Sequence, residues 1–141
     1  MTTVGEALEE WHRQHPRGDE DVSSFAGLQL FWVKLGPIRV PVPHPGQLHW
    51  HDLHHLLHGY EPDLIGEMEI SAFELRTGVK TGVVLFLCLA GGTLGLLMAP
   101  VRTVRAWRSA RGQRNLYGSQ VPYEQVLRQP LPELRRWMHL D

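Results

Sequence analysis

The sequence predicts a mainly α-helical fold, a compact helical bundle around an antiparallel helix hairpin with a proline-rich extended connector before it. Two segments with helical spacing of apolar residues, 47–58 and 62–77, are separated by a short loop at Gly59, which is typical of two antiparallel helices. Four prolines within residues 36–46 exclude a regular helix directly before this hairpin. A chain of 141 residues has the length of one domain, residues 1–141.

The first segment of the chain is predicted to be an amphipathic helix over residues 3–14, with Val4, Leu8 and Trp11 on one face. It lacks the basic and apolar regions of a secretory signal. We expect residues 1–22 to be this helix and a linker, and residues 23–140 to form the core.

Residues 23–35 are apolar and rich in aromatic side chains, without a clean period, so that both helix and strand fit. We favour a helix that runs into the following Gly-Pro turn. The connector 36–46 is then stiff and extended, since each proline fixes its own φ and pushes the preceding residue toward extended backbone. It is either a rigid linker or a wall of a site, with Arg39 or His44 facing a ligand.

After the hairpin comes an uncharged stretch over residues 82–101, long enough as a helix to match a bilayer core. A buried central helix fits it best, an element that dips into a membrane or lies on it comes next, and a spanning helix fits least. The spacing Gly91-x-x-x-Gly95 would allow close helix packing. Two short helices are expected in the tail, with Pro132 in the first turn of the second.

The charges are distributed unevenly, although the formal net charge is only −1. From Leu75 to Tyr123 there is no Asp or Glu, whereas arginines recur at every third position from Arg102 to Arg114. On a helix over residues 101–116 this spacing winds around the axis. Such a helix is either simply solvated or makes contact with an anionic membrane or an acidic ligand. No nucleic-acid motif is present, and the single cysteine excludes a disulfide framework.

Histidine and carboxylate side chains converge on the predicted hairpin. His51 and His55 are one turn apart on one helical face, and Asp52 lies about 100° round the helix. Glu67 follows Gly59 at the distance by which His51 precedes it, so antiparallel helices would bring the two to the same level. Two imidazoles and two carboxylates suit Zn²⁺, and the same set could hold Fe²⁺ or Mn²⁺.

The other polar residues of the hairpin are assigned lesser roles. His49, His54 and His58 are interpreted as supporting groups behind the ligands or as surface groups. Glu74 lies seven residues after Glu67 on the same face, and we favour a surface salt-bridge partner over a group that deepens the site.

The spaced motif His51-Asp52-x-x-His55, followed after eleven residues by Glu67, resembles the zinc motif HDxxH-(x)11-E of the ubiquinone biosynthesis family Coq-four. The segments FWVKLGP, HGYEPDLIGE and RNLY are also similar to bacterial members, and the resemblance covers roughly residues 25–140. It implies a mostly helical, lipid-associated protein whose zinc ligands are His51, Asp52, His55 and Glu67. It also implies removal of the C1 carboxylate of a polyprenylated hydroxybenzoate-type precursor, in some descriptions with hydroxylation, or a scaffold role in the quinone-biosynthesis complex.

Two functions follow from this resemblance, and the residues alone leave open whether the protein is an enzyme. One is a metal-dependent decarboxylase, in which the metal is a Lewis acid, the arginines Arg39, Arg102 and Arg105 bind substrate, and residues 82–98 hold a prenyl tail. The alternative is a non-catalytic lipid-binding scaffold with structural zinc. A phosphohydrolase that uses the His-Asp pair is disfavoured, because the aspartates it would need are missing.

The expected partners are a prenylated aromatic acid or isoprenoid lipid, other quinone-biosynthesis proteins and a second copy in a homodimer, but not nucleic acid. The expected location is the cytoplasm, with peripheral attachment to the inner face of the cell membrane.

Overall fold

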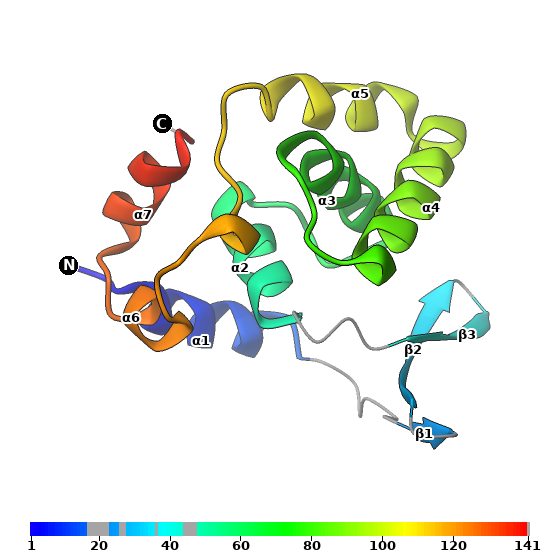
Figure 1. The fold of residues 1–141 in the computed structure, drawn as a ribbon, viewed down its shortest axis with the longest axis horizontal. Coiled ribbons are helices and arrows are strands. Elements are labelled where there is room, and N and C mark those ends of the chain that lie inside the picture. Colours follow the sequence, from blue (N-terminus) through cyan, green and yellow to red (C-terminus); the bar gives the residue numbers. More distant parts are fainter. Residues whose placement is uncertain (17–22, 26–27, 36, 44–47, 141) are drawn as a thin grey trace.

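The computed structural model describes residues 1–16, 23–25, 28–35, 37–43 and 48–140, and Figure 1 shows their arrangement. The prediction of a mainly helical bundle is confirmed. The described helices are α1 (Val4–Gln14), α2 (Leu48–His58), α3 (Leu64–Thr77), α4 (Gly82–Met98), α5 (Pro100–Ser109), the 3₁₀ helix η1 (Leu116–Gly118), α6 (Tyr123–Leu127) and α7 (Leu131–Met138). The described strands are β1 (Ser23–Phe25), β2 (Leu28–Leu35) and β3 (Ile38–Pro43).

Helix α1 begins with a capping box. The Thr3 amide donates to Oε2 of Glu6 over 2.8 Å, and the Glu6 amide donates to the Thr3 hydroxyl over 3.3 Å, so two amides of the first turn are satisfied. The apolar face with Val4 and Leu8 is buried in the main core. That core joins α1 to side chains of α2, α3 and the last helices, among them Leu53, Leu57, Phe73, Leu116, Val126, Leu134 and Met138.

The helix favoured for residues 23–35 is wrong, because this segment forms β1 and β2 of an antiparallel sheet with the order β1-β2-β3. The described part of the connector runs extended as β3, and it pairs with β2 in a register that places Phe31 opposite Val42. β3 is an edge strand, where its prolines do not interrupt a ladder on both sides. The pairing partner for the apolar segment is thus the proline-rich segment that follows it. His44 lies outside the described residues.

Helix α4 lies against α3 through two glycines. A Cβ atom added to Gly91 would come 2.9 Å from Cβ of Ser71, and one added to Gly95 would come 2.9 Å from Cβ of Met68. Only glycine allows the backbones to approach so closely, and the expected close packing at this spacing is confirmed. The approach places α4 beside the first turns of α3, on the helix that carries Glu67.

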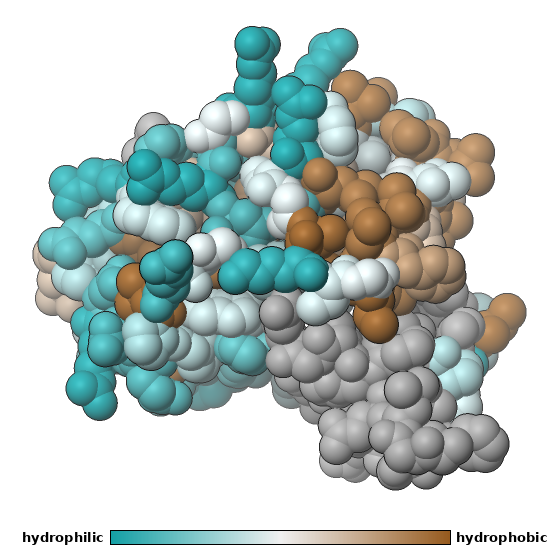
Figure 2. Space-filling view, viewed as in Figure 1, coloured by the Kyte–Doolittle hydropathy of each residue, from teal (hydrophilic) through white to brown (hydrophobic). Residues whose placement is uncertain are grey.

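The interpretation of residues 82–101 as a buried central helix is wrong, because only one face of α4 is covered. Val84 and Cys88 are buried, whereas Phe86 is 68% exposed and Leu97 is 78% exposed. Figure 2 shows this apolar surface over α4 and the neighbouring part of α5, away from the hydrophilic surface on the opposite side of the view. Within the described ranges, no helix has the length and apolar character needed to cross a membrane.

The remaining helices follow the predictions more closely. Pro100 begins α5, which ends at Ser109 and is therefore shorter than the expected segment 101–116. The tail forms α6 and α7, with Pro132 in the first turn of α7 as expected.

Candidate metal centre

Two helices meet at the histidine cluster. His51 and His55 project from one face of α2, and α2 ends at His58, directly before the expected Gly59. Asp63 caps α3, since its Oδ1 accepts the Gly66 amide over 2.7 Å. Gly66 has no room for a side chain, because a Cβ atom there would lie 1.7 Å from the carbonyl oxygen of Glu61. The loop thus folds tightly over the start of α3 and leaves Glu67, in the first turn, facing α2.

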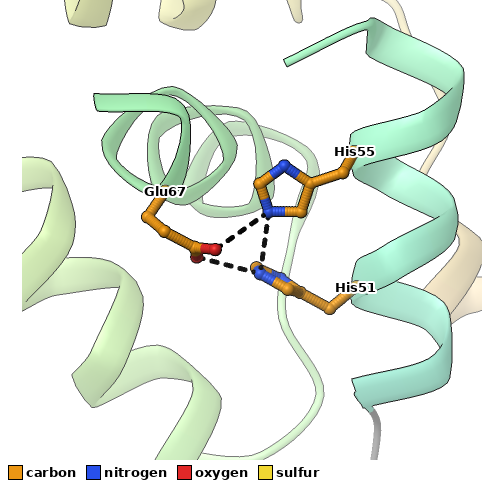
Figure 3. A group of neighbouring side chains, drawn as sticks. All are labelled: His51, His55 and Glu67. Carbon is orange, nitrogen blue, oxygen red and sulfur yellow. Dashed lines mark hydrogen bonds and ion pairs between the residues drawn. The ribbon is translucent and has the colours of Figure 1, made fainter. Parts of the chain in front are cut away.

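Three ligand atoms converge between these helices, as Figure 3 shows. Nε2 of His51 lies 3.0 Å from Oε2 of Glu67, and Nε2 of His55 lies 3.2 Å from Oε1 of the same carboxylate. The two Nε2 atoms are 3.2 Å apart, and one ligand atom of each residue can be chosen so that all lie within 4.8 Å of one another. The predicted meeting of His51 with Glu67 across the hairpin is confirmed.

In the rings of His51 and His55, the contact made by Nδ1 shows which form of the ring places Nε2 at the point where the three residues meet. Nδ1 of His55 lies 3.0 Å from the carbonyl oxygen of Tyr60, which can only accept, so this nitrogen carries a hydrogen. Nδ1 of His51 lies 3.1 Å from Oε1 of Glu74 and donates to it when that carboxylate is ionised. In their neutral forms both rings therefore point an Nε2 lone pair at the same place. Two lone pairs at this separation repel each other unless a proton or a metal ion lies between them.

The spacing of the group fits a tetrahedral metal ion. Zinc binds histidine nitrogen and carboxylate oxygen at about 2.0–2.2 Å, and two such ligands on a tetrahedral ion lie roughly 3.3 Å apart. The distance of 3.2 Å between the two Nε2 atoms is close to this value, while the distances of 3.0 and 3.2 Å to Glu67 each end on a different oxygen of its carboxylate. The group could hold a metal ion, and its nitrogen and oxygen donors are compatible with zinc, ferrous iron or manganese.

The electrostatics of the group also favour a cation. Burial disfavours the charged form of His51, but the carboxylates of Glu74 and Glu67 outweigh burial and raise its pKa well above the usual range. Partial burial acts to raise the pKa of Glu67, but the charge and hydrogen bond of His51 and the hydrogen bond of His55 lower it well below the usual range. The metal-free site thus keeps a proton on His51, and a metal ion would displace that proton on binding.

Asp52, predicted as a fourth ligand, is not among the residues of this group. Its side chain is nearly buried, and Oδ2 lies 3.3 Å from Nε2 of His12 on α1. Its role as a ligand stays a prediction.

The predicted substrate-binding arginines come from two elements, Arg39 from β3 and both Arg102 and Arg105 from α5. Arg39 is exposed on β3. Arg102 on α5 pairs with the buried Glu69 through two hydrogen bonds of 3.0 and 2.7 Å. Arg105 lies one turn further along α5 and lines an open groove with a volume of about 740 Å³. Their binding of substrate remains a prediction.

The interpretation of Glu74 as a surface residue is wrong. Its side chain is buried, and it contacts His51, His54, Cys88 and Tyr117. Sequence reasoning missed Cys88 and Tyr117 altogether. The spacing of seven residues from Glu67, with Phe73 and Leu75 on either side, was the available signal for Glu74.

Of the three further histidines of α2, His54 and His49 take the expected roles and His58 takes neither. His54 is fully buried behind the metal group and donates to Glu74, whereas His49 is exposed. His58 packs against Phe73, and its Nε2 is buried without a hydrogen-bond partner within the described part of the chain.

A scan against protein-family models gives no match to this chain, and a search of the curated proteins gives none either.

Proposed function

We propose that this protein, similar to the Coq-four family, acts in quinone biosynthesis as a metal-dependent decarboxylase of a polyprenylated hydroxybenzoate-type precursor. The observation that supports it is the convergence of His51, His55 and Glu67, which occupy the matching positions of the HDxxH-(x)11-E motif, on one point between α2 and α3. Zinc is the metal that the resemblance implies.

The reaction itself needs no redox partner. The bond between ring carbon C1 and the carboxylate breaks, its electron pair stays on the ring, a proton from water takes the place of the carboxylate, and CO₂ leaves. A bound metal would supply Lewis acidity toward a phenol or carboxylate oxygen and so stabilise the negative charge that develops. His51, His55 and Glu67 would hold the metal, while the Tyr60 carbonyl and Glu74 fix the two imidazole rings.

The apolar surface of α4 and α5 supports a lipid substrate and peripheral contact with the inner face of the cell membrane. Its exposed apolar side chains are Val83, Leu85, Phe86, Leu89, Leu96, Leu97, Met98, Val101, Val104 and Trp107. Arg105 and Arg108 line the groove beside Val101 and Val104, so cationic groups adjoin this surface. Apolar side chains bordered by arginines suit an amphiphile whose head is acidic, or a layer of anionic lipid.

Metal analysis and native mass spectrometry of the purified protein are the first test. We expect one metal ion per chain and a co-purified isoprenoid, with metal lost from Glu67→Gln and His55→Ala. The matched controls are Glu61→Gln, an exposed acid at the same loop, and His49→Ala, an exposed histidine of the same helix. A protein that takes up no metal, or whose uptake is equal in all four variants, would refute the site.

Turnover is the second test. A prenylated 4-hydroxybenzoate with a labelled ring carboxylate should release labelled CO₂ with the metal-loaded protein, and not with Glu67→Gln or with metal-free protein. Release that continues at the same rate without the metal group would overturn the proposed mechanism.

The second candidate is a non-catalytic lipid-binding scaffold for other quinone-biosynthesis proteins or for a homodimer, and the extent of the exposed apolar surface favours it. In this case metal removal should unfold the protein, and no CO₂ should be released under any condition. Flotation with anionic vesicles tests the surface itself. The pair Phe86→Glu and Leu97→Glu should abolish vesicle binding, while Val121→Glu, outside α4 and α5, should not.

A further inference from the structure

Glu74 has a position that the metal ligands alone do not explain. It lies two turns after Glu67 on α3, and its carboxylate is buried directly behind His51. Oε1 accepts from Nδ1 of His51 over 3.1 Å, from Nδ1 of His54 over 2.8 Å and from the Tyr117 hydroxyl over 2.9 Å. Oε2 accepts from the Cys88 thiol over 3.2 Å.

These four donors indicate whether the Glu74 carboxylate is ionised or protonated. An ionised carboxylate accepts at about four positions and donates at none, so the set matches a charged Glu74. The donors come from α2, α4 and η1, so three separate elements hold one carboxylate in place.

The contacts of His54 show which of its two ring nitrogens donates and which accepts. Its Nε2 accepts the amide of Leu116 over 3.3 Å, so the hydrogen of the neutral ring must be on Nδ1, which faces Glu74. The ring is fully buried and cannot exchange its partners with water. The direction of the hydrogen bond from His54 to Glu74 is therefore fixed.

The two candidate histidine ligands are consequently supported by different acceptors. His55 donates to a neutral backbone carbonyl, that of Tyr60, whereas His51 donates to a charged carboxylate. A carboxylate that accepts from the outer nitrogen of a ligating imidazole fixes the ring and makes the other nitrogen a stronger donor to the metal.

We propose that Glu74 is a positioning residue that orients His51 and strengthens its bond to the metal held by His51, His55 and Glu67. This inference rests on the metal site of the proposed function and extends it to a residue outside the ligand motif. Tyr117 and Cys88 act one step further out, because their hydrogen bonds go to the Glu74 carboxylate.

The test compares Glu74→Gln with Glu69→Gln, since Glu69 is also a buried acid of α3 but pairs with Arg102. Zinc affinity is measured by competition with a chromogenic chelator, and the ligand field by the absorption spectrum of the Co²⁺-loaded protein. We expect Glu74→Gln to bind zinc about 10–100-fold more weakly with a changed Co²⁺ spectrum, and Glu69→Gln to match wild type in both. Wild-type affinity and spectrum in Glu74→Gln would overturn the inference while leaving the metal site intact.

A second measurement needs no variant and so does not depend on whether Glu74→Gln folds. In ¹⁵N-labelled, zinc-loaded wild-type protein, the histidine NMR signals should show His51 with a hydrogen on Nδ1 and zinc on Nε2. Zinc on Nδ1 of His51 would overturn the inference. A wild-type protein that binds no zinc would overturn the metal site of the proposed function and the inference with it.

Discussion

The contact between α3 and α4 can be tested by adding one methyl group at Gly95. In the Gly95→Ala variant the new Cβ would come 2.9 Å from Cβ of Met68 and 2.5 Å from Oγ1 of Thr103. Carbon atoms pack best about 3.5–4.0 Å apart, so the helices must separate locally by roughly 0.6–1.1 Å. Rotation of the Met68 side chain brings no relief, because its Cβ is bonded directly to the backbone of α3. Overpacking of this kind costs about 1–3 kcal/mol.

Alanine also favours a helix over glycine by about 1 kcal/mol, and this gain has to be separated from the steric cost. Gly82→Ala, in the first turn of the same helix, is the control, because among the described residues beyond its chain neighbours and its own helix backbone no atom lies within 4 Å of the added methyl group. We expect Gly95→Ala to be less stable than Gly82→Ala by about 1–3 kcal/mol in the free energy of unfolding. Urea unfolding of the metal-free proteins, followed by circular dichroism, measures the difference. Equal stability of the two variants would show that α4 does not lie on α3 as described.

Three further predictions concern the metal site and its surroundings. Zinc at a hundred times its dissociation constant should stabilise the protein by about 2.7 kcal/mol, seen as a rise in melting temperature that Glu67→Gln lacks. Burial lowers the pKa of His58 from 6.5 to about 3, so between these values the unfolded chain binds a proton that the folded chain does not. Stability should therefore fall as the pH is lowered from 6.5 toward 3, by up to roughly 1.4 kcal/mol per pH unit from this group, and urea unfolding should show a shallower fall for His58→Phe. Burial and the neighbouring charge of Glu74 raise the pKa of the Cys88 thiol. A thiol reagent should therefore modify Cys88 only after the protein unfolds. Rapid modification of the native protein would contradict the burial of this side chain.

The part of the site that could be predicted from the sequence was the part set by local geometry. The period of the helix places His51 and His55 one turn apart, and the short loop with Gly59 brings Glu67 back to their level. Both depend on residues close together in the chain. The helices of the hairpin and the tail could be predicted for the same reason.

The surroundings of the site could not be predicted, because they depend on contacts between distant segments. Glu74 is buried because η1 packs over it. Tyr117 of η1, which lies 43 residues after Glu74 in the chain, donates a hydrogen bond to it. Residues 82–101 are apolar all round, so the sequence could not show which face is covered and which remains exposed. The strands within residues 23–35 form because the proline-rich segment after them supplies an extended partner. The sequence of either segment alone does not indicate this pairing.

Residues 2–4 pair with residues 129–131, far away in the sequence, and this pairing affects the order of folding. Thr3 and Pro130 form an isolated antiparallel bridge, in which the Val4 amide donates to the carbonyl of Gln129 and the Leu131 amide to that of Thr2. Figure 1 shows α1 beside α6, with the labelled N-terminus near α7. During synthesis the apolar face of α1 therefore stays partly uncovered until α6 and α7 have left the ribosome. The histidine helix α2, which packs on α1, should acquire its final position only in this late step, so metal binding should report completion of the fold.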